Sequence, residues 1–215
     1  MVARRTKELD AAVGVVRDAA ATANLGGEAH GLAFDVGEKE AVHRIAGAAA
    51  ALVSPIEIVI HAASTLGPLP VPLLVDTECE ELQRVPDVNL IGPFRLTKAL
   101  AGPMVLRQRG LVLFVSSDAA VSAYPGWGSY GVSKAAQDHL ARSFAAELDP
   151  ARFFSVEPGE MDTKMHADAM PDADRAALAH PATVAAQLLR LIARAETLGN
   201  GARLIAADFA VGGAQ

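Results

Sequence analysis

The chain has 215 residues, of which 51% are hydrophobic and 20% charged, so it can bury a large core and is not intrinsically disordered. Its formal net charge of −6, with no cluster of Lys and Arg, argues against a nucleic-acid partner. The single cysteine, Cys79, cannot form an internal disulfide, which predicts a reducing, cytoplasmic environment.

The first part of the chain alternates between helical and strand-like patterns. Apolar residues at helical spacing predict a helix over 6–23, and a strand over 31–36 and a second helix over 38–53 follow. The most apolar stretch, 45–63, is interrupted by Ser54, Pro55 and Glu57. This interruption indicates a helix, a turn and a buried strand instead of a membrane span, so no membrane partner is expected.

The alternation continues to the end of the chain. A long helical region is expected at 77–107, where Pro86 and Pro93 should kink or divide it. The later elements are strands at 111–117, 152–157 and 202–209 and helices at 128–148 and 181–196. Strands that alternate with helices throughout predict a single α/β domain over 1–215, built on a doubly wound, mostly parallel sheet.

Three side chains near the middle of the chain carry the strongest chemical signal. Ser117 ends an apolar strand, where an open parallel sheet presents its binding crevice. Tyr130 and Lys134 are one helical turn apart and share a face, so the cation should lower the pKa of the phenol. This arrangement suits proton transfer at a carbonyl or alcohol oxygen. The structural alternatives are a half-buried aromatic at a helix start and a solvated helix lysine.

The pattern Tyr-x-x-x-Lys with an upstream serine resembles that of the short-chain dehydrogenase/reductases. Further segments match this family in order along the chain: Asp35–Val36, 61–64, Asn89 and 158–163. The resemblance implies a Rossmann-like fold and an NAD(P)-dependent oxidoreductase that reduces a carbonyl or oxidises an alcohol on a small molecule. It also implies a homodimer or homotetramer, formed through the helices at 77–107 and 128–148.

The resemblance also assigns roles to residues of this chain. Tyr130 would be the general acid/base, and Ser117 would hold the substrate oxygen against it. Lys134 would bind the nicotinamide ribose, and Asn89 would organise a proton path near the lysine, the alternative for Asn89 being a residue at a helix kink. The residues expected to bind cofactor are Arg4, Arg5, Asp35, Val36, Ala62, Ala63, Ser64, Tyr130, Lys134, Pro158, Gly159, Met161 and Thr163.

The choice of cofactor depends on Arg4 and Arg5. At this position of a dinucleotide-binding fold an acidic residue binds the adenosine ribose, whereas an arginine accommodates a 2′-phosphate. Two arginines and no acid favour NADP(H) over NAD(H). The alternative is an ordinary solvated basic start. No metal is expected, because the six histidines are scattered without ligand spacing.

One part of the family pattern has no counterpart here. The family opens with a strand, a glycine-rich turn that holds the cofactor pyrophosphate, and a helix. Here Gly26 and Gly27 follow a helix, and residues 1–5 resemble the end of the family's second strand. We therefore expect a domain that lacks the first β-α unit, whether the true start lies upstream or the chain is truncated. Such a chain has an alternative function, as a non-catalytic scaffold or an inactive fragment.

Two further segments each have two possible interpretations. Residues 165–180 occupy the family's variable substrate-covering region, so Met165, His166 and Met170, with Tyr124 and Trp127, either line an apolar pocket or form an ordinary amphipathic cover. Residues 127–131 nearly match the Gly-x-Ser-x-Gly signature of hydrolases, but a tryptophan replaces the first glycine and fits poorly in a strained elbow. A hydrolase is therefore rejected.

Overall fold

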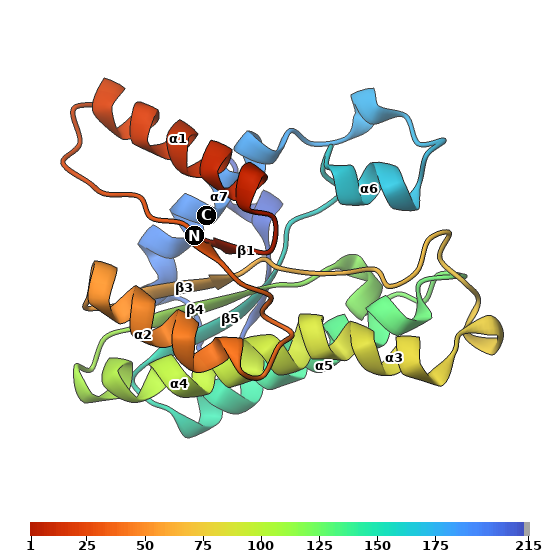
Figure 1. Cartoon of the computed structure of the whole chain (residues 1–215), viewed down its shortest axis with the longest axis horizontal. Helices are drawn as coiled ribbons and strands as arrows, with labels where there is room; N and C mark the ends of the chain where they lie inside the picture. The colour runs from red at the N-terminus through yellow and green to blue at the C-terminus, as the bar shows by residue number, and fades with distance from the viewer. Residues whose placement is uncertain (213–215) are drawn as a thin grey trace.

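The computed structural model describes residues 1–212, in which helices and strands alternate along the chain (Figure 1). The strands are β1 (Val2–Ala3), β2 (Leu32–Ala33), β3 (Ile58–His61), β4 (Leu111–Val115), β5 (Arg152–Glu157) and β6 (Arg203–Ile205). The α-helices are α1 (Thr6–Thr22), α2 (Ala41–Val53), α3 (Cys79–Pro86), α4 (Gly92–Leu106), α5 (Gly128–Glu147), α6 (Lys164–Ala169) and α7 (Pro181–Arg194).

All strand pairings are parallel, which confirms the predicted α/β class and its parallel sheet. The sheet is divided, however. Strands β1 and β2 pair with each other, and β3, β4, β5 and β6 form a second sheet in that order.

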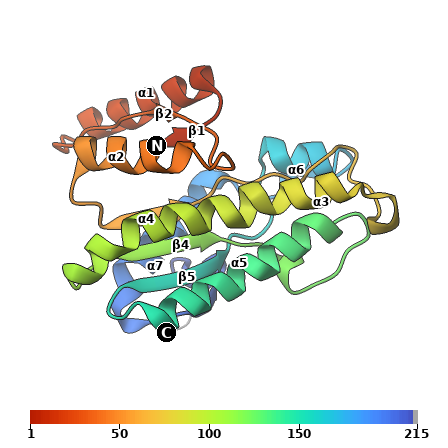
Figure 2. The same ribbon diagram turned by 60° about the horizontal axis from the view of Figure 1, so that its bottom comes forward.

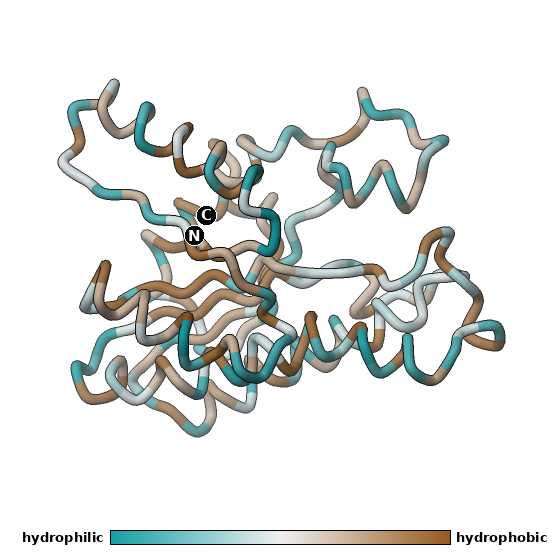
Figure 3. The backbone as a smooth tube through the Cα atoms, viewed as in Figure 1, coloured by the Kyte–Doolittle hydropathy of each residue, from teal (hydrophilic) through white to brown (hydrophobic). Residues whose placement is uncertain are grey.

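The four-stranded sheet is covered on both faces, as Figure 2 shows for the helices on one side. Along β4, Val112 and Phe114 pack under α4 and α5, whereas Leu111 and Leu113 pack under α7. Both sets of side chains are therefore apolar, which is typical of a parallel strand buried on both faces. In Figure 3 these strands form a hydrophobic centre beneath helices of mixed polarity.

The two sheets border a cavity of about 780 Å³. Its lining includes Val2 and Ala3 of β1 and Ile58, Val59 and Ile60 of β3. Within the described residues, β1 pairs only with β2, and β3 only with β4. Two unpaired parallel edges therefore border the same apolar cavity, and Ile58 and Ile60 remain 47% and 46% exposed on an edge strand.

The helical region predicted at 77–107 is divided, as its prolines indicated. α3 ends at Pro86, a π-helical segment covers Asp87–Ile91, and Pro93 lies in the first turn of α4. Proline is tolerated there because the first turn of a helix needs no intrahelical N–H bond.

The strand predicted over 202–209 is only partly correct. Strand β6 ends at Ile205, and Ala206–Phe209 form a 3₁₀ helix. Ala206 and Phe209 are both buried in the cluster under α7, which turns the chain away from the sheet. Within residues 1–212, no helix has the length and apolarity needed to cross a membrane.

Candidate active site

The helix that carries the predicted catalytic residues lies directly against the end of β4. Ser117 follows this strand and caps the short 3₁₀ helix Asp118–Ala120, and α5 begins soon after, at Gly128. A Cβ atom on Gly131 would lie 2.7 Å from the carbonyl oxygen of Ala119, so only glycine allows this close approach. The packing brings the first turn of α5, with Tyr130, beside Ser117.

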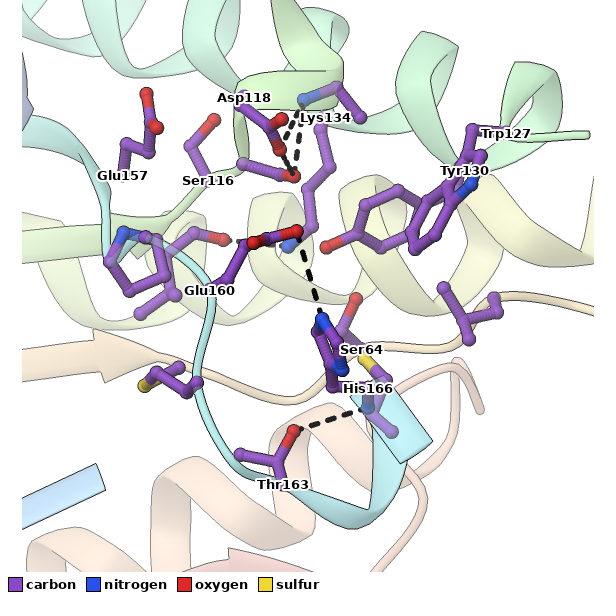
Figure 4. A pocket seen from close by; sticks show the side chains of 18 of the residues that line it. Ser64, Ser116, Asp118, Trp127, Tyr130, Lys134, Glu157, Glu160, Thr163 and His166 are labelled. Atoms are coloured by element: carbon purple, nitrogen blue, oxygen red, sulfur yellow. Dashed lines mark hydrogen bonds and ion pairs between the residues drawn. The ribbon is translucent and has the colours of Figure 1, made fainter. Parts of the chain in front are cut away.

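Most of the residues predicted for the site surround one cavity of about 670 Å³, shown in part in Figure 4. The cavity lies at the carboxyl ends of β3, β4 and β5, where a parallel α/β sheet binds its ligands. The predicted residues that line it are Ala62, Ser64, Ser117, Tyr130, Lys134, Pro158, Gly159, Met161 and Thr163.

Lys134 reaches this cavity through the core. Its Nζ donates a 2.6 Å hydrogen bond to the carbonyl oxygen of Val115 and lies 3.4 Å from Oε1 of Gln137. Burial lowers the pKa of Lys134 from 10.5 to about 8, although the charge of Asp138 acts in the opposite direction. The solvated-lysine alternative is therefore wrong, because this side chain is buried.

Tyr130 departs from one expectation. Burial raises the pKa of its phenol above the usual value of 10.0, and hydrogen bonding with Ser117 and Ser64 only partly offsets this effect. The negative charge of Asp118 also raises the pKa. The expectation that Lys134 lowers the pKa of Tyr130 is thus wrong for this structure. The Lys134 ammonium donates to the Val115 carbonyl oxygen and lies over the Tyr130 ring, 5.5 Å from the ring centroid.

Asn89 does not line the cavity but lies buried behind it, in the π-helical segment. Its side-chain oxygen accepts from the Ser64 hydroxyl at 3.1 Å and from the Thr65 amide at 2.8 Å. Its side-chain nitrogen donates to the Thr65 carbonyl and the Ser133 hydroxyl, both at 2.9 Å. Asn89 therefore ties the loop after β3 to α5, and its side chain has little capacity left for a further partner.

The residues predicted to hold the adenosine end lie around the cavity between the two sheets. Arg4, Arg5, Asp35, Val36 and Ala63 line that cavity, together with Ala62 and Ser64, which line both cavities. Arg4 Nη1 lies 3.5 Å from an oxygen of Asp35, and Arg5 pairs with Glu8 at 3.0 Å. Arg5 caps α1 without a side-chain hydrogen bond, so the N–H groups of the first turn receive no such acceptor.

His61, where the family usually has an asparagine, is part of the core. Its ring stacks on Phe114 at 5.0 Å between centroids, and Nε2 lies 2.9 Å from the Thr97 hydroxyl. Burial, and next the charge of Lys134, lower its pKa to about 3, so the ring is neutral at physiological pH. His61 therefore fixes the end of β3 and offers no charge to a ligand.

The aromatic and sulphur-containing side chains of residues 124–127 and 165–170 line the cavity. Tyr124, Trp127, Met165, His166 and Met170 form part of its wall, as a pocket lining and not only a surface cover. His166 Nε2 lies 3.7 Å from Glu160 Oε1, and Figure 4 marks this contact.

Two charged residues beside Ser117 were not predicted from the sequence. Arg203, on β6, donates to the Ser117 carbonyl at 3.0 Å and to Asp138 and Glu157 at 3.0 and 2.6 Å. Asp118 accepts a hydrogen bond from the Ser117 hydroxyl. Adjacency to Ser117 could have indicated Asp118, but Arg203 is 86 positions away and has no local signal.

A family model described as short chain dehydrogenase matches residues 2–174, which include all of these side chains except Arg203. The chain belongs to the short-chain dehydrogenase family. Among the described residues of this short-chain dehydrogenase, no group of three or more His, Cys, Asp or Glu is placed to hold a metal ion.

Similarity to individual proteins is consistent with this family assignment. Short chain aldehyde dehydrogenase 1 of Euphorbia lathyris is 32% identical over 184 residues, which cover 82% of this chain and 64% of the relative. A short chain dehydrogenase of Pseudocercospora fijiensis is 36% identical over 163 residues, 73% of this chain and 50% of the relative. The chain thus spans less than two thirds of the length of either protein. The E. coli oxidoreductase yciK has a similar structure, with a TM-score of 0.83 at 25% identity over 95% of this chain and 82% of that one.

Proposed function

We propose that this short-chain dehydrogenase interconverts a carbonyl compound and an alcohol with NADP(H), using Tyr130 as general acid/base. The observation that carries the proposal is the convergence of Ser117, Tyr130 and Lys134 on one cavity at the carboxyl ends of the strands. A phenol, a hydroxyl and a buried ammonium in one apolar cavity suit proton transfer to or from a substrate oxygen.

The proton chemistry follows from the surroundings of each group. The raised pKa of Tyr130 keeps the phenol protonated at neutral pH, so it can donate a hydrogen bond to the substrate oxygen and a proton during reduction. Lys134 is an ammonium below its pKa of about 8, and it lies over the Tyr130 ring, 5.5 Å from its centroid, so it brings a positive charge to the site. Ser117 and Tyr130 together would hold the oxygen in place.

The residues present fit a nicotinamide dinucleotide at both of its ends. NADPH supplies the hydride when it is bound. Pro158, Gly159, Met161 and Thr163 form the wall of the cavity that would face the nicotinamide, and Lys134 would bond the ribose. Ala62, Ala63 and Ser64 lead from there toward Asp35, Val36 and the two arginines, because they line the cavity between the sheets.

We prefer NADP(H) to NAD(H) because of the start of α1. Arg4 and Arg5 are 56% and 67% exposed at their side chains and flank a helix N-terminus that lacks a side-chain cap. Guanidinium groups and free N–H groups at a helix start both favour a phosphate dianion.

Titration of the full chain with NADPH, and separately with NADH, tests this proposal through the fluorescence of the reduced nicotinamide. We expect saturable binding that is tighter for NADPH. Arg4→Asp should weaken NADPH binding about tenfold or more and leave NADH binding nearly unchanged, since one charge-assisted contact is lost. Lys7→Asp, the same charge change at an exposed position of α1, is the control and should not alter the ratio. An unchanged ratio in Arg4→Asp would remove Arg4 from the site.

The expectation that the domain 1–215 lacks one β-α unit also becomes a proposal. We propose that a further parallel strand fits between β1 and β3, in the cavity of about 780 Å³. The unpaired edges of β1 and β3 and the exposed face of Ile58 and Ile60 support it, since a parallel strand is normally buried on both faces.

One observation favours the alternative function, a non-catalytic scaffold. Only Arg4 and Arg5 connect β1 to α1, so the described residues offer no glycine-rich turn there for a pyrophosphate. The same titration separates the two functions. A folded chain that binds neither nucleotide supports the scaffold, whereas saturable binding of NADPH supports the enzyme.

The remaining partners are proposals as well. We propose a small-molecule substrate, a cytoplasmic location and a homodimer or homotetramer that uses α4 and α5. Leu106 on α4 and Val132 on α5 support the assembly, because they are large apolar side chains that are 86% and 57% exposed. Light scattering on the purified chain measures its oligomeric state. A monomer at micromolar concentration would contradict the proposed homodimer or homotetramer.

A further inference from the structure

The side chain of Arg203 joins three segments of the fold. Arg203 lies on β6, and its Nε donates a 3.0 Å hydrogen bond to Oδ2 of Asp138, on α5. Its Nη2 donates to Oε2 of Glu157, at the end of β5, at 2.6 Å, and to the Ser117 carbonyl oxygen at 3.0 Å. One guanidinium group therefore links α5, the end of β5 and the loop after β4.

The partners of this guanidinium group belong to the candidate site or adjoin it. Asp138 follows Lys134 by one helical turn. Glu157 and Ser117 both line the cavity of about 670 Å³, whereas Arg203 does not. Arg203 can therefore act on the site only through these neighbours.

The contact with Ser117 is made where the chain leaves the sheet. Just beyond β4, the Ser116 N–H still bonds the Val156 carbonyl oxygen of β5, at 2.7 Å. The Ser117 carbonyl oxygen accepts from the Ala120 N–H at 3.1 Å, but this bond stays within the same 3₁₀ turn. Within residues 1–212, the bond from Arg203 is therefore what ties the Ser117 carbonyl to another strand.

The ion pairs of Arg203 are largely buried. The side chains of Arg203 and Glu157 are 18% exposed, and that of Asp138 is 4% exposed. Removing one partner of such a pair leaves the other charge buried and uncompensated, so these contacts hold the guanidinium group firmly. A guanidinium group is planar and presents its N–H groups in a fixed fork. Its two acidic partners therefore fix the direction in which Nη2 meets the Ser117 carbonyl oxygen.

We propose that Arg203 is a positioning residue of the site, which holds Ser117 beside Tyr130 by fixing the Ser117 carbonyl oxygen from β6. The inference rests on the proposed function and adds to it a residue that lies outside the cavity. Arg203 supplies geometry as well as charge. A lysine would keep a cation near Asp138 and Glu157, but it lacks the planar fork that also reaches the carbonyl oxygen.

The experiment compares wild-type protein with Arg203→Lys, which retains the positive charge, by NMR measurement of amide hydrogen exchange in the full chain at pH 7. The reporter is the N–H of Ala119, which donates to the Ser117 hydroxyl oxygen at 3.2 Å and to Oδ1 of Asp118 at 2.9 Å. Exchange of this N–H requires the turn after Ser117 to open. We expect Arg203→Lys to speed it about tenfold or more relative to the N–H groups of β4, because a hydrogen bond from a charged donor is lost.

Arg152→Lys is the matched control. Arg152 is also a strand arginine with an acidic partner, Glu196, and its Nη2 donates to the carbonyl oxygens of Glu196 and Leu198 at 2.7 and 3.1 Å. Its side chain is 20% exposed, but it lies at the amino end of β5, away from the cavity. Arg152→Lys should leave the exchange of the Ala119 N–H relative to β4 unchanged within about twofold, because distant sites act independently.

Turnover gives a second measurement, with rates normalised to the concentration of NADPH-binding sites. For an alcohol or ketone that wild-type protein converts, Arg203→Lys should lower kcat about tenfold and change the KM for NADPH less than about twofold, since Ser117 acts on the substrate oxygen. Arg152→Lys should keep both constants.

Each outcome bears on the inference. An exchange ratio that is unchanged in Arg203→Lys, or raised equally in Arg152→Lys, contradicts it, as does a wild-type protein whose Ala119 N–H is unprotected. If Arg203→Lys does not fold, wild-type protein supplies the test. The two Nη groups of Arg203 should then give separate proton signals, because the bonds at Nη2 prevent rotation, and a single averaged signal contradicts the inference.

Failure of the proposed function is distinguishable from failure of the inference. If wild-type protein converts no alcohol or ketone, the proposed function fails and the role of Arg203 in the reaction falls with it. If wild-type protein converts such a compound and Arg203→Lys keeps the full kcat, only the inference fails.

Discussion

Burial of the Lys134 ammonium links the candidate site to the stability of the molecule. The pKa of Lys134 is 10.5 when it is free of the fold and about 8 in the folded chain, mainly because of desolvation. Between these two values the unfolded state binds more protons than the folded state, so the free energy of unfolding rises with pH. Below pH 8 the Lys134 side chain is charged in both the folded and the unfolded state, so the free energy that its burial costs no longer changes with pH.

The buried charge predicts that the free energy of unfolding depends differently on pH in wild-type protein and in Lys134→Met. Methionine keeps the length of the side chain without its charge. From pH 7 to 9.5 the free energy of unfolding of the wild type should rise by about 2 kcal/mol relative to the variant. Urea denaturation at several pH values measures this difference. If the two proteins keep a constant difference across this range, the lysine is not desolvated in the folded chain.

Tyr130 and Asp118 show what can and cannot be predicted at the scale of a residue. The spacing of Tyr130 and Lys134 on one helix face is local, so the sequence alone places both beside a strand end. The raised pKa of Tyr130 instead reflects burial and the nearby charge of Asp118, and both depend on how a loop packs on α5. Local patterns therefore predicted that these side chains lie together, but not the direction in which the pKa of Tyr130 shifts.

At the scale of elements, the approach of α5 to the loop after β4 depends on Gly131. A methyl group there would lie 2.7 Å from the Ala119 carbonyl oxygen, a backbone atom that cannot move without shifting the loop. Gly131→Ala should therefore lower the free energy of unfolding by about 1–3 kcal/mol. It should also weaken substrate binding, because Ser117 and Tyr130 are attached to the two segments that are forced apart.

Gly14 provides the matched control for this substitution. It lies within α1, and a Cβ atom there would meet nothing within 4 Å. Gly14→Ala should stabilise the chain by up to about 1 kcal/mol, because alanine is the better helix former. Thermal or urea unfolding measures both variants. Equal effects at the two positions would mean that the contact between Gly131 and Ala119 is not tight.

Element boundaries were predictable where the signal was a strong local one. Pro86 and Pro93 mark the division of the long helical region as expected, since Pro86 ends α3 and Pro93 lies in the first turn of α4. The end of β6 was not predictable. Residues 206–209 look like a strand in sequence, but Ala206 and Phe209 turn under α7, a contact between segments that no local pattern encodes.

At the scale of the whole molecule, the alternation of strands and helices predicted the parallel α/β class, and the family was evident from motifs in the right order. The division into two sheets is a matter of strand pairing. It depends on the edges of β1 and β3, which pair only on one side within the described residues. Alternation predicts the number and order of elements, but pairing between strands that are distant in sequence is a tertiary property.

The measurement that tests the central claim most directly is the consumption or formation of NADPH by wild-type protein and Tyr130→Phe. Absorbance at 340 nm is followed over a panel of apolar alcohols and ketones, and NADPH affinity is measured in parallel by fluorescence. We expect wild-type protein to turn over at least one pair. Tyr130→Phe should lose at least a hundredfold in rate, as expected for a general acid/base, and keep nearly the same affinity for NADPH. A variant that retains the full rate would contradict the role of Tyr130, and a wild-type protein that binds NADPH but turns over no pair would contradict the proposed activity on such compounds.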